Sequence, residues 1–297
     1  MSKRSKDTGN GRPASSEAAA QMIEYFAAQL AASRVSDAVD VAEEIMFDAW
    51  ECDDPRKRGS MARKALKASP DCADAYVLLA EETASTPEEA VDLYVQGVAA
   101  GERALGPAAF EEDVGMFWGL LETRPYMRAR LGLALALWNA GRTDEAVSHA
   151  EGMLRLNPND NQGVRYVVLN WLQQLGRNAD ADGLLRRYKD DCGTEWAWSA
   201  TLAAFRRNGD RAAARKALTR AIEANPHVAA FLLGQKKLPK ALPAYVEMGG
   251  KDEAAAYAEA AVATWMMTPG ALEWLSAALN PAASASPPRS RRRTGAT

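Results

Sequence analysis

The stretch Leu-Asn-Pro-Asn-Asp-Asn-Gln-Gly, residues 156–163, ends a run of helix-forming residues at Asn157-Pro158. A similar run ends at Ala-Asn-Pro-His, residues 224–227, and the two prolines, Pro158 and Pro226, lie 68 residues apart. Because proline has no N–H group and does not fit a helix interior, each site predicts a helix end. The interval equals two periods of about 34 residues, the length of a repeat built from two stacked helices.

The residues between these stops follow the tetratricopeptide pattern. That pattern has bulky residues near positions 4, 7 and 11, small residues near 8, 20 and 27, and proline near 32. With Pro158 at position 32, Leu133 and Leu137 fall at bulky positions and Ala146 at a small one. The middle unit has no closing proline and matches less well. The predicted units are 127–160, 161–194 and 195–228, with Gly141, Gly176 and Gly209 in the turns.

Weaker units precede and follow these three. Pro70, taken as position 32, predicts a degenerate unit at 39–72, and a further unit follows at 73–100. Thr86 before Pro87 and two glutamates has the order of a helix N-cap, a first-turn proline and an acidic first turn. The apolar stretch 101–124 breaks the period as an insertion that should pack onto the array. After residue 228 the pattern lapses into a short helix, a proline-punctuated connector, a helix at 252–267 and a last helix at 270–278.

We therefore expect an all-α fold, a right-handed superhelix (solenoid) of tetratricopeptide-like helix pairs with a C-terminal helical cap. The repeat array should span 17–228 and the cap 229–278. Residues 1–16 form a basic tail, and residues 279–297 form an Arg-rich tail containing Arg289, Arg291, Arg292 and Arg293. Both tails have little apolar content, so we expect them to be disordered.

Composition narrows the classes of function. The chain of 297 residues has a net charge of −3, but the tails contribute +3 and +4, which leaves about −10 for the body. The body therefore offers no general attraction to a nucleic-acid backbone. Three widely spaced cysteines suit a reduced compartment, and no apolar run is long enough for a membrane span or signal peptide. We expect a cytoplasmic protein.

Several segments resemble a known family. Arg124-Pro-Tyr-Met-Arg-Ala-Arg130, Asn225-Pro-His-Val228 and Pro269-Gly-Ala-Leu272 are similar to segments of bacterial tetratricopeptide proteins related to the suppressor of tumorigenicity seven family. The resemblance covers roughly residues 70–276 and implies a helical repeat fold with a scaffolding or interaction role. It brings no catalytic residues. Animal members carry N-terminal membrane segments that have no counterpart in this sequence, so the resemblance does not imply a membrane location here.

Enzyme chemistry finds little support in the residues. The two histidines, His149 and His227, lie in different units, and Ser148 points about 100° away from His149 on a helix. Acidic pairs such as Glu43-Glu44 and Glu81-Glu82 lack the histidine or spaced carboxylate of a metal site and suit solvated helix faces. Phosphate-binding loops and hydrolase motifs are absent from the sequence. We expect no enzyme activity, no catalytic residue, no metal and no cofactor.

The concave groove of such an array is the candidate binding site. In this architecture it is lined by positions 2, 5, 9, 12 and 13 of the first helix of each unit. Aromatic, aliphatic and arginine side chains at these positions in the three clear units suit a peptide or helix that carries apolar groups and carboxylates. The pattern that clamps a C-terminal carboxylate is missing. The partner-binding candidates are Arg128, Trp138, Asn139, Arg165, Trp196 and Arg206.

Two alternatives stay open. The Arg-rich tail, together with the Arg206-Arg207 corner, predicts a nucleic-acid-associated protein. The groove could also be filled by the chain itself, through the insertion 101–124 and the segment 228–250, which would make its apolar part ordinary core. The identity of a protein partner is beyond the sequence.

Overall fold

The computed structural model describes residue 23, residues 37–242 and residues 245–280, and these residues form helices and loops without a strand. The all-α prediction is therefore confirmed for this part of the chain. The expected tail at 1–16 and most of the expected tail at 279–297 lie outside the described residues, but Leu279 still belongs to the last helix. The chain divides into two compact units, Met1–Asn161 and Gln162–Thr297. Their boundary falls inside the 156–163 stretch, where the closing proline and a polar turn interrupt the helices.

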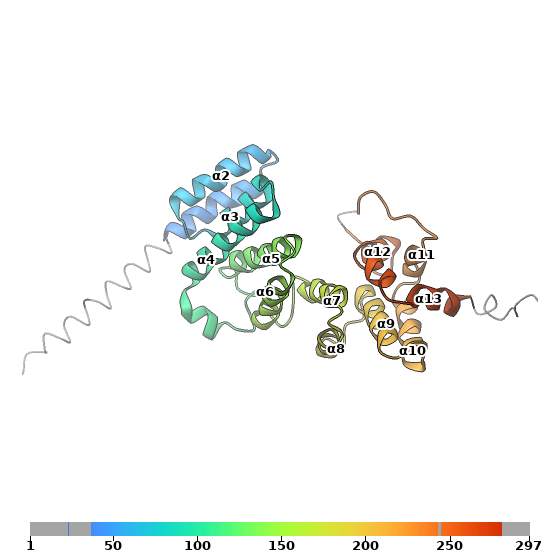
Figure 1. Cartoon of the computed structure of the whole chain (residues 1–297). Coiled ribbons are helices and arrows are strands. Elements are labelled where there is room, and N and C mark those ends of the chain that lie inside the picture. The colour runs from blue at the N-terminus through green and yellow to red at the C-terminus, as the bar shows by residue number, and fades with distance from the viewer. Residues whose placement is uncertain (1–22, 24–36, 243–244, 281–297) are drawn as a thin grey trace, which may run out of the picture. The chain divides into compact units, whose positions relative to one another are not determined.

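The N-terminal unit is a stack of helices in which each helix packs against the next, and α3 also packs against α5 (Figure 1). The first described helix, 37–51, buries Ala42, Met46 and Ala49 against α2 and α3. These positions are spaced i, i+4 and i+7, so they share one helix face. The helices are 37–51, α2 (Pro55–Ala68), α3 (Ala73–Thr83), α4 (Pro87–Glu112), α5 (Arg124–Asn139) and α6 (Thr143–Leu156).

The local start of α4 follows the sequence prediction. The Thr86 side chain accepts a hydrogen bond from the backbone N–H of Glu89 at 3.1 Å, and Pro87 occupies the first turn. The sequence predicts that this helix ends near residue 101, but α4 continues to Glu112. Gly101 lies inside the helix, where the absence of a side chain lets α4 pack closely against Tyr126 of α5. The helical backbone of α4 is interrupted at Gly106, which has a φ of 71° and is followed by Pro107. The insertion does pack down, since Phe117 is fully buried.

Glycines with positive φ mark the turns inside the three clear helix pairs. Gly141, Gly176 and Gly209 have φ values of 77°, 69° and 64°, which side-chain-bearing residues rarely adopt. Each follows the first helix of a pair and precedes the second. The second helices then begin at Thr143, Asn178 and Ala212, intervals of 35 and 34 residues. The predicted turn glycines are thus confirmed in their local geometry.

The C-terminal unit begins with two helix pairs and ends with three further helices. The pairs are formed by α7 (Val164–Gln174) with α8 (Asn178–Arg187), and by α9 (Thr194–Asn208) with α10 (Ala212–Ala224). The later helices are α11 (Val228–Leu232), α12 (Lys251–Met266) and α13 (Ala271–Leu279). Nowhere in the described ranges is a helix both long and apolar enough to cross a bilayer.

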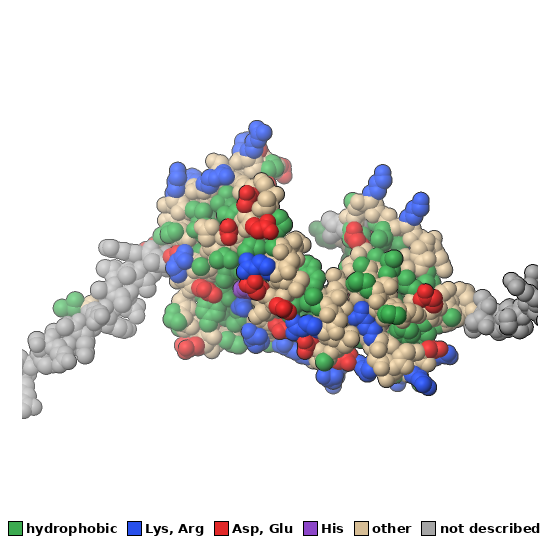
Figure 2. Space-filling model, in the orientation of Figure 1, with side chains coloured by type: hydrophobic (Ala, Val, Ile, Leu, Met, Phe, Trp, Pro, Cys, Tyr) green, Lys and Arg blue, Asp and Glu red, His purple; other side chains and the backbone are tan. Residues whose placement is uncertain are grey.

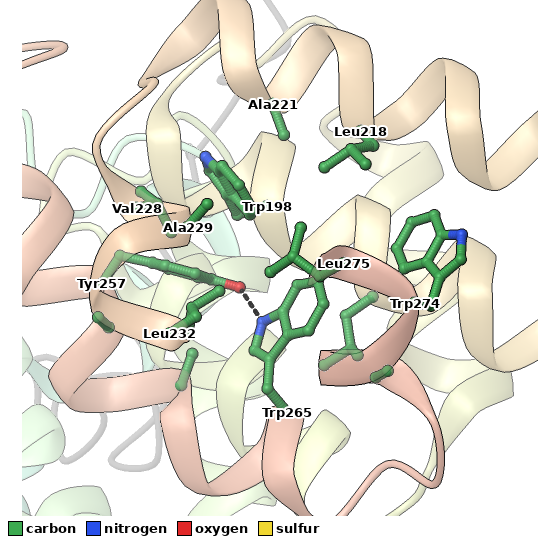
Figure 3. Packing of buried hydrophobic residues seen from close by; sticks show 14 of the residues in the cluster. Trp198, Leu218, Ala221, Val228, Ala229, Leu232, Tyr257, Trp265, Trp274 and Leu275 are labelled. Carbon is green, nitrogen blue, oxygen red and sulfur yellow. Dashed lines mark hydrogen bonds between the residues drawn. The ribbon is translucent and has the colours of Figure 1, made fainter. Parts of the chain in front are cut away.

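Aromatic residues form the centre of the C-terminal core (Figure 3). Trp198 of α9 and Trp265 of α12 are fully buried, with ring centroids 6.2 Å apart. The Trp265 indole N–H donates to the Tyr257 hydroxyl at 2.9 Å, and the Trp198 indole N–H donates to the Asn225 carbonyl at 3.3 Å. Because buried polar groups are costly without partners, these bonds let large amphipathic rings occupy the core.

Candidate functional site

A groove crosses the first helices of three successive helix pairs in the N-terminal unit. It encloses about 570 Å³ between helix 37–51, α3 and α5. On helix 37–51 the groove residues are spaced i, i+4 and i+7, beside the buried face of the same helix. We call this site the N-terminal groove; it is lined by Glu43, Met46, Phe47, Trp50, Asp74, Glu81, Leu121, Pro125 and Arg128.

Large apolar side chains stand exposed along this groove. Phe47 is 66% exposed, Leu121 is 70% exposed and Trp50 is 38% exposed. Figure 2 shows acidic and hydrophobic side chains interspersed over the visible face of this unit. Neighbouring exposed aromatic groups in a concave site are typical of surfaces that bind a partner. Leu121 comes from the insertion, which borders the N-terminal groove and leaves it open.

The N-terminal groove carries an excess of negative charge. Arg128 donates from Nε to Asp74 Oδ1 at 2.8 Å and from Nη2 to Asp74 Oδ2 at 2.5 Å, so this pair is neutralised internally. Glu43 and Glu81 have no ion-pair partner among the described residues. Burial, followed by repulsion from Asp74, raises the pKa of Glu43. Burial also raises the pKa of Glu81, although Arg58 lowers it. The unpaired carboxylates therefore favour a nearby cation.

The corresponding face of the C-terminal unit is covered by the chain itself. Helix α12 packs against the first helices α7 and α9. The Asn170 amide donates to the Ala260 carbonyl at 3.3 Å, and the Thr194 hydroxyl donates to Glu253 Oε2 at 2.6 Å. Predicted groove positions on this face, including Leu169 and Leu172, are buried. The expected filling segment was 228–250, but the helix that covers this face is α12, which begins at Lys251.

Arg206 ties α12 in place. Its guanidinium donates to the Thr268 hydroxyl at 2.9 Å, to the Thr264 carbonyl at 3.3 Å and to the Gln173 carbonyl at 2.7 Å. The neighbouring Arg207 forms a bidentate ion pair with Asp182. The Arg206-Arg207 corner, proposed above as a nucleic-acid contact, is therefore engaged internally. The nucleic-acid contact itself stays a prediction, and both guanidinium groups would have to exchange these partners to make it.

Arg165 and Trp196 meet in one cluster of the C-terminal unit. Arg165 pairs with Asp191 at 2.8 Å and lies 4.3 Å from the centroid of the Tyr166 ring. Trp196 contacts the rings of Tyr166 and Tyr188 edge to face, with centroids 5.9 and 6.0 Å away. Trp196 is only 3% exposed, so its expected place on an open groove is corrected: it packs among these tyrosines.

The remaining predicted residues lie on α5. Arg128 lines the N-terminal groove but is paired with Asp74, which leaves little charge for a ligand carboxylate. Trp138 is half-buried and Asn139 is exposed near the end of the same helix. Neither lines the N-terminal groove. The structure thus brings Arg165 and Trp196 together in one cluster. It leaves Trp138 and Asn139 at the end of α5, and it engages Arg128 with Asp74 and Arg206 with α12.

The sequence contained a signal for the groove residues that were missed. Groove positions 5, 9 and 12, counted in the degenerate unit 39–72, are Glu43, Phe47 and Trp50. Positions 2 and 9 of unit 73–100 are Asp74 and Glu81. All five line the N-terminal groove. The weak repeat match of units 39–72 and 73–100 hides these groove positions, and the acidic pairs at 43–44 and 81–82 look in sequence like solvated helix faces.

A second hollow of about 990 Å³ lies between α8, α9 and α10 of the C-terminal unit. Small side chains form its floor, with Ala197, Ala200 and Ala204 spaced along α9. Charged side chains of both signs border it, and Arg207 is already paired with Asp182. Because the charges are mixed, this hollow shows no preference for the charge of a ligand. The N-terminal groove has an excess of one charge and is therefore the more specific candidate for a binding site.

Comparisons with known proteins place this sequence in a family. The family model described as "ST7 protein" matches residues 30–192 and 197–291. Suppressor of tumorigenicity 7 proteins of Macaca fascicularis, Rattus norvegicus and Mus musculus are each 30% identical over 286 residues. The matches cover 81% of this chain, 53% of the macaque protein and 49% of the rat and mouse proteins, so the chain spans about half the length of these relatives. No solved structure matches. The chain belongs to the suppressor of tumorigenicity 7 protein family.

Proposed function

We propose that this chain is a non-enzymatic interaction protein that holds a segment of another protein in the N-terminal groove. In this proposal the helix pairs are tetratricopeptide-like units of a right-handed superhelix. The resemblance to bacterial members of the family, which implies a repeat fold with an interaction role, is part of the same proposal. The two supporting features are the repeated positive-φ turn glycines and the packing of α3 against both α4 and α5.

One observation carries the binding proposal. The first helices of the N-terminal unit leave exposed Phe47 and Trp50 along a hollow, whereas α12 covers the equivalent face of the C-terminal unit. Exposed aromatic side chains next to water cost free energy that a partner's apolar group would recover. An open groove of this kind suits a bound segment better than catalysis, because its charged residues include no nucleophile paired with a base.

The cytoplasmic location stays a proposal. It is supported by Cys52, Cys72 and Cys192, which are all free thiols in the structure. Unpaired cysteines are typical of reducing compartments, where disulfides do not persist.

Site-specific photo-crosslinking tests the binding proposal. A photo-reactive phenylalanine analogue at Phe47 in the full chain should capture a partner protein in cells of the source organism. The matched control places the same analogue at Val41, which is 52% exposed on the same helix but does not line the N-terminal groove. Capture at both positions alike, or at neither, would contradict binding through this groove.

A further inference from the structure

The N-terminal groove has a charge preference opposite to the one that the sequence pattern indicates. Four ionisable side chains line it, Glu43, Asp74, Glu81 and Arg128, and only one of them is basic. Because Asp74 accepts hydrogen bonds from both Nε and Nη2 of Arg128, the charge of that arginine is already compensated by a carboxylate. An acidic ligand would meet Glu43 and Glu81, which no ion pair in the described residues neutralises, and would be repelled by these like charges.

The surroundings add to this local imbalance. Residues 37–161 contain 24 acidic and 12 basic side chains, whereas residues 162–280 contain 12 acidic and 15 basic ones. The negative charge of the body is therefore concentrated in the unit that carries the open groove. Such a field attracts cationic segments over about a Debye length of 10 Å and speeds their encounter.

The protein already holds one guanidinium at the edge of this site. Arg58 lies with its guanidinium carbon 5.5 Å from the centroid of the Trp50 ring and donates to Glu82 at 2.9 Å. Arg58 thus contacts an aromatic ring, Trp50, and a carboxylate, Glu82. Phe47 and Glu43 offer the same two kinds of group in the groove. The chemistry of the groove wall is therefore suited to a lysine or arginine side chain of a ligand.

The C-terminal unit shows the contrasting arrangement. There Arg206 is unpaired with any carboxylate in the described residues and instead donates to the Thr264 carbonyl and the Thr268 hydroxyl at the C-terminal end of α12. A helix C-terminus carries partial negative charge, so the positive charge of Arg206 stabilises the end of α12. In the N-terminal groove the arginine is neutralised by Asp74, and the unpaired charges are carboxylates. The arginine of the C-terminal face therefore serves an internal contact, whereas the unpaired carboxylates of the N-terminal groove are open to a ligand.

We propose that the N-terminal groove binds a cationic segment of a partner protein, one that places lysine or arginine beside Glu43 and Glu81 and inserts a bulky apolar side chain between Phe47 and Leu121. This inference rests on the proposed function and specifies the partner chemistry. Charge complementarity supplies its specificity, and the exposed aromatic and aliphatic groups supply its apolar anchor. The chain's own Arg-rich segment 281–297 has the charge but lacks the large apolar side chain.

Calorimetric titration of the full chain with synthetic peptides tests the charge preference. The main probe is a peptide of about 14 residues with four lysines, two leucines and one phenylalanine on a Gly/Ser background. Matched probes replace the lysines by glutamates or the apolar residues by serine, and a fourth probe is the segment 281–297. The lysine-leucine peptide should bind about tenfold or more tighter than either matched probe, and its affinity should fall as salt rises.

Variants locate the binding on the protein. Glu43→Lys with Glu81→Lys should abolish binding of the cationic probe and strengthen binding of the glutamate probe. Glu44→Lys is the matched control, because Glu44 is exposed on the same helix but does not line the groove. Circular dichroism confirms that each variant keeps its helicity. Equal affinity for both probe charges, or an unchanged affinity in the double variant, would overturn the inference.

Two outcomes separate this inference from the function on which it rests. If crosslinking at Phe47 captures a partner through an acidic or neutral segment, the groove binds proteins but the charge preference is wrong. If the 281–297 peptide binds tighter than the lysine-leucine probe, and its deletion strengthens probe binding, the occupant is the chain's own tail and the proposed partner segment is rejected.

Discussion

Glu195 should make the stability of the C-terminal unit depend on pH. It is the second residue of α9 and is partly buried. Burial, and then repulsion from Asp191, raises the pKa of Glu195 from 4.5 to about 7, with Arg165 opposing the shift and Glu253 adding to it. Folding therefore favours the protonated carboxyl group over the carboxylate.

The size and sign of the effect follow from this shift. One pKa unit corresponds to about 1.4 kcal/mol, so the full shift would be worth roughly 3 kcal/mol; partial exposure reduces this to about 2 kcal/mol. Below pH 4.5 the carboxyl group is protonated in both states and the difference vanishes. Between pH 4.5 and 7 the folded state keeps a proton that the unfolded chain has lost, so stability falls as pH rises.

The substitution Glu195→Gln removes this titration while keeping the shape of the side chain. Urea unfolding followed by circular dichroism at pH 5 and pH 8 should show wild type losing about 1.5 kcal/mol relative to the variant, because the unfolded carboxyl group is already largely ionised at pH 5. Glu259→Gln, at an exposed position of α12, should follow wild type. Parallel pH profiles for wild type and Glu195→Gln would refute the burial argument, because titrating groups that do not interact with Glu195 cancel in the comparison.

Two further predictions concern packing. Gly101→Ala should destabilise the N-terminal unit by about 1–3 kcal/mol, because a Cβ there would lie 2.9 Å from Tyr126 Cβ and 3.1 Å from its Cα. Gly183→Ala, in an open helix position, should instead be neutral or stabilise by about 0.5–1 kcal/mol; equal thermal shifts for both would contradict this. Trp265→Phe should cost about 2–4 kcal/mol in urea unfolding, since it leaves a cavity and removes the bond to the Tyr257 hydroxyl. A loss under 1 kcal/mol would show that this core repacks freely.

The candidate site was only partly predictable from sequence. The position rule places Arg128 in a groove, and the structure does find it there. The same rule could not reveal that Asp74, 54 residues earlier, neutralises that arginine. Trp196 illustrates a second limit, because its nominal groove position is buried by two tyrosines from α7 and the end of α8. A periodic pattern assigns a helix face, but it does not say which neighbour occupies that face.

The sequence by itself determined the local features of this protein. Helix ends at Asn157-Pro158, the capped start of α4 and the glycine turns depend on residues within a few positions of each other, through steric limits on φ and backbone hydrogen bonding. Only the tertiary structure decided which groove is open and what charge it presents. Those properties depend on contacts between residues far apart in the chain: α12 covers α7 and α9, and Asp74 neutralises Arg128, whereas Phe47 and Trp50 are left exposed to solvent.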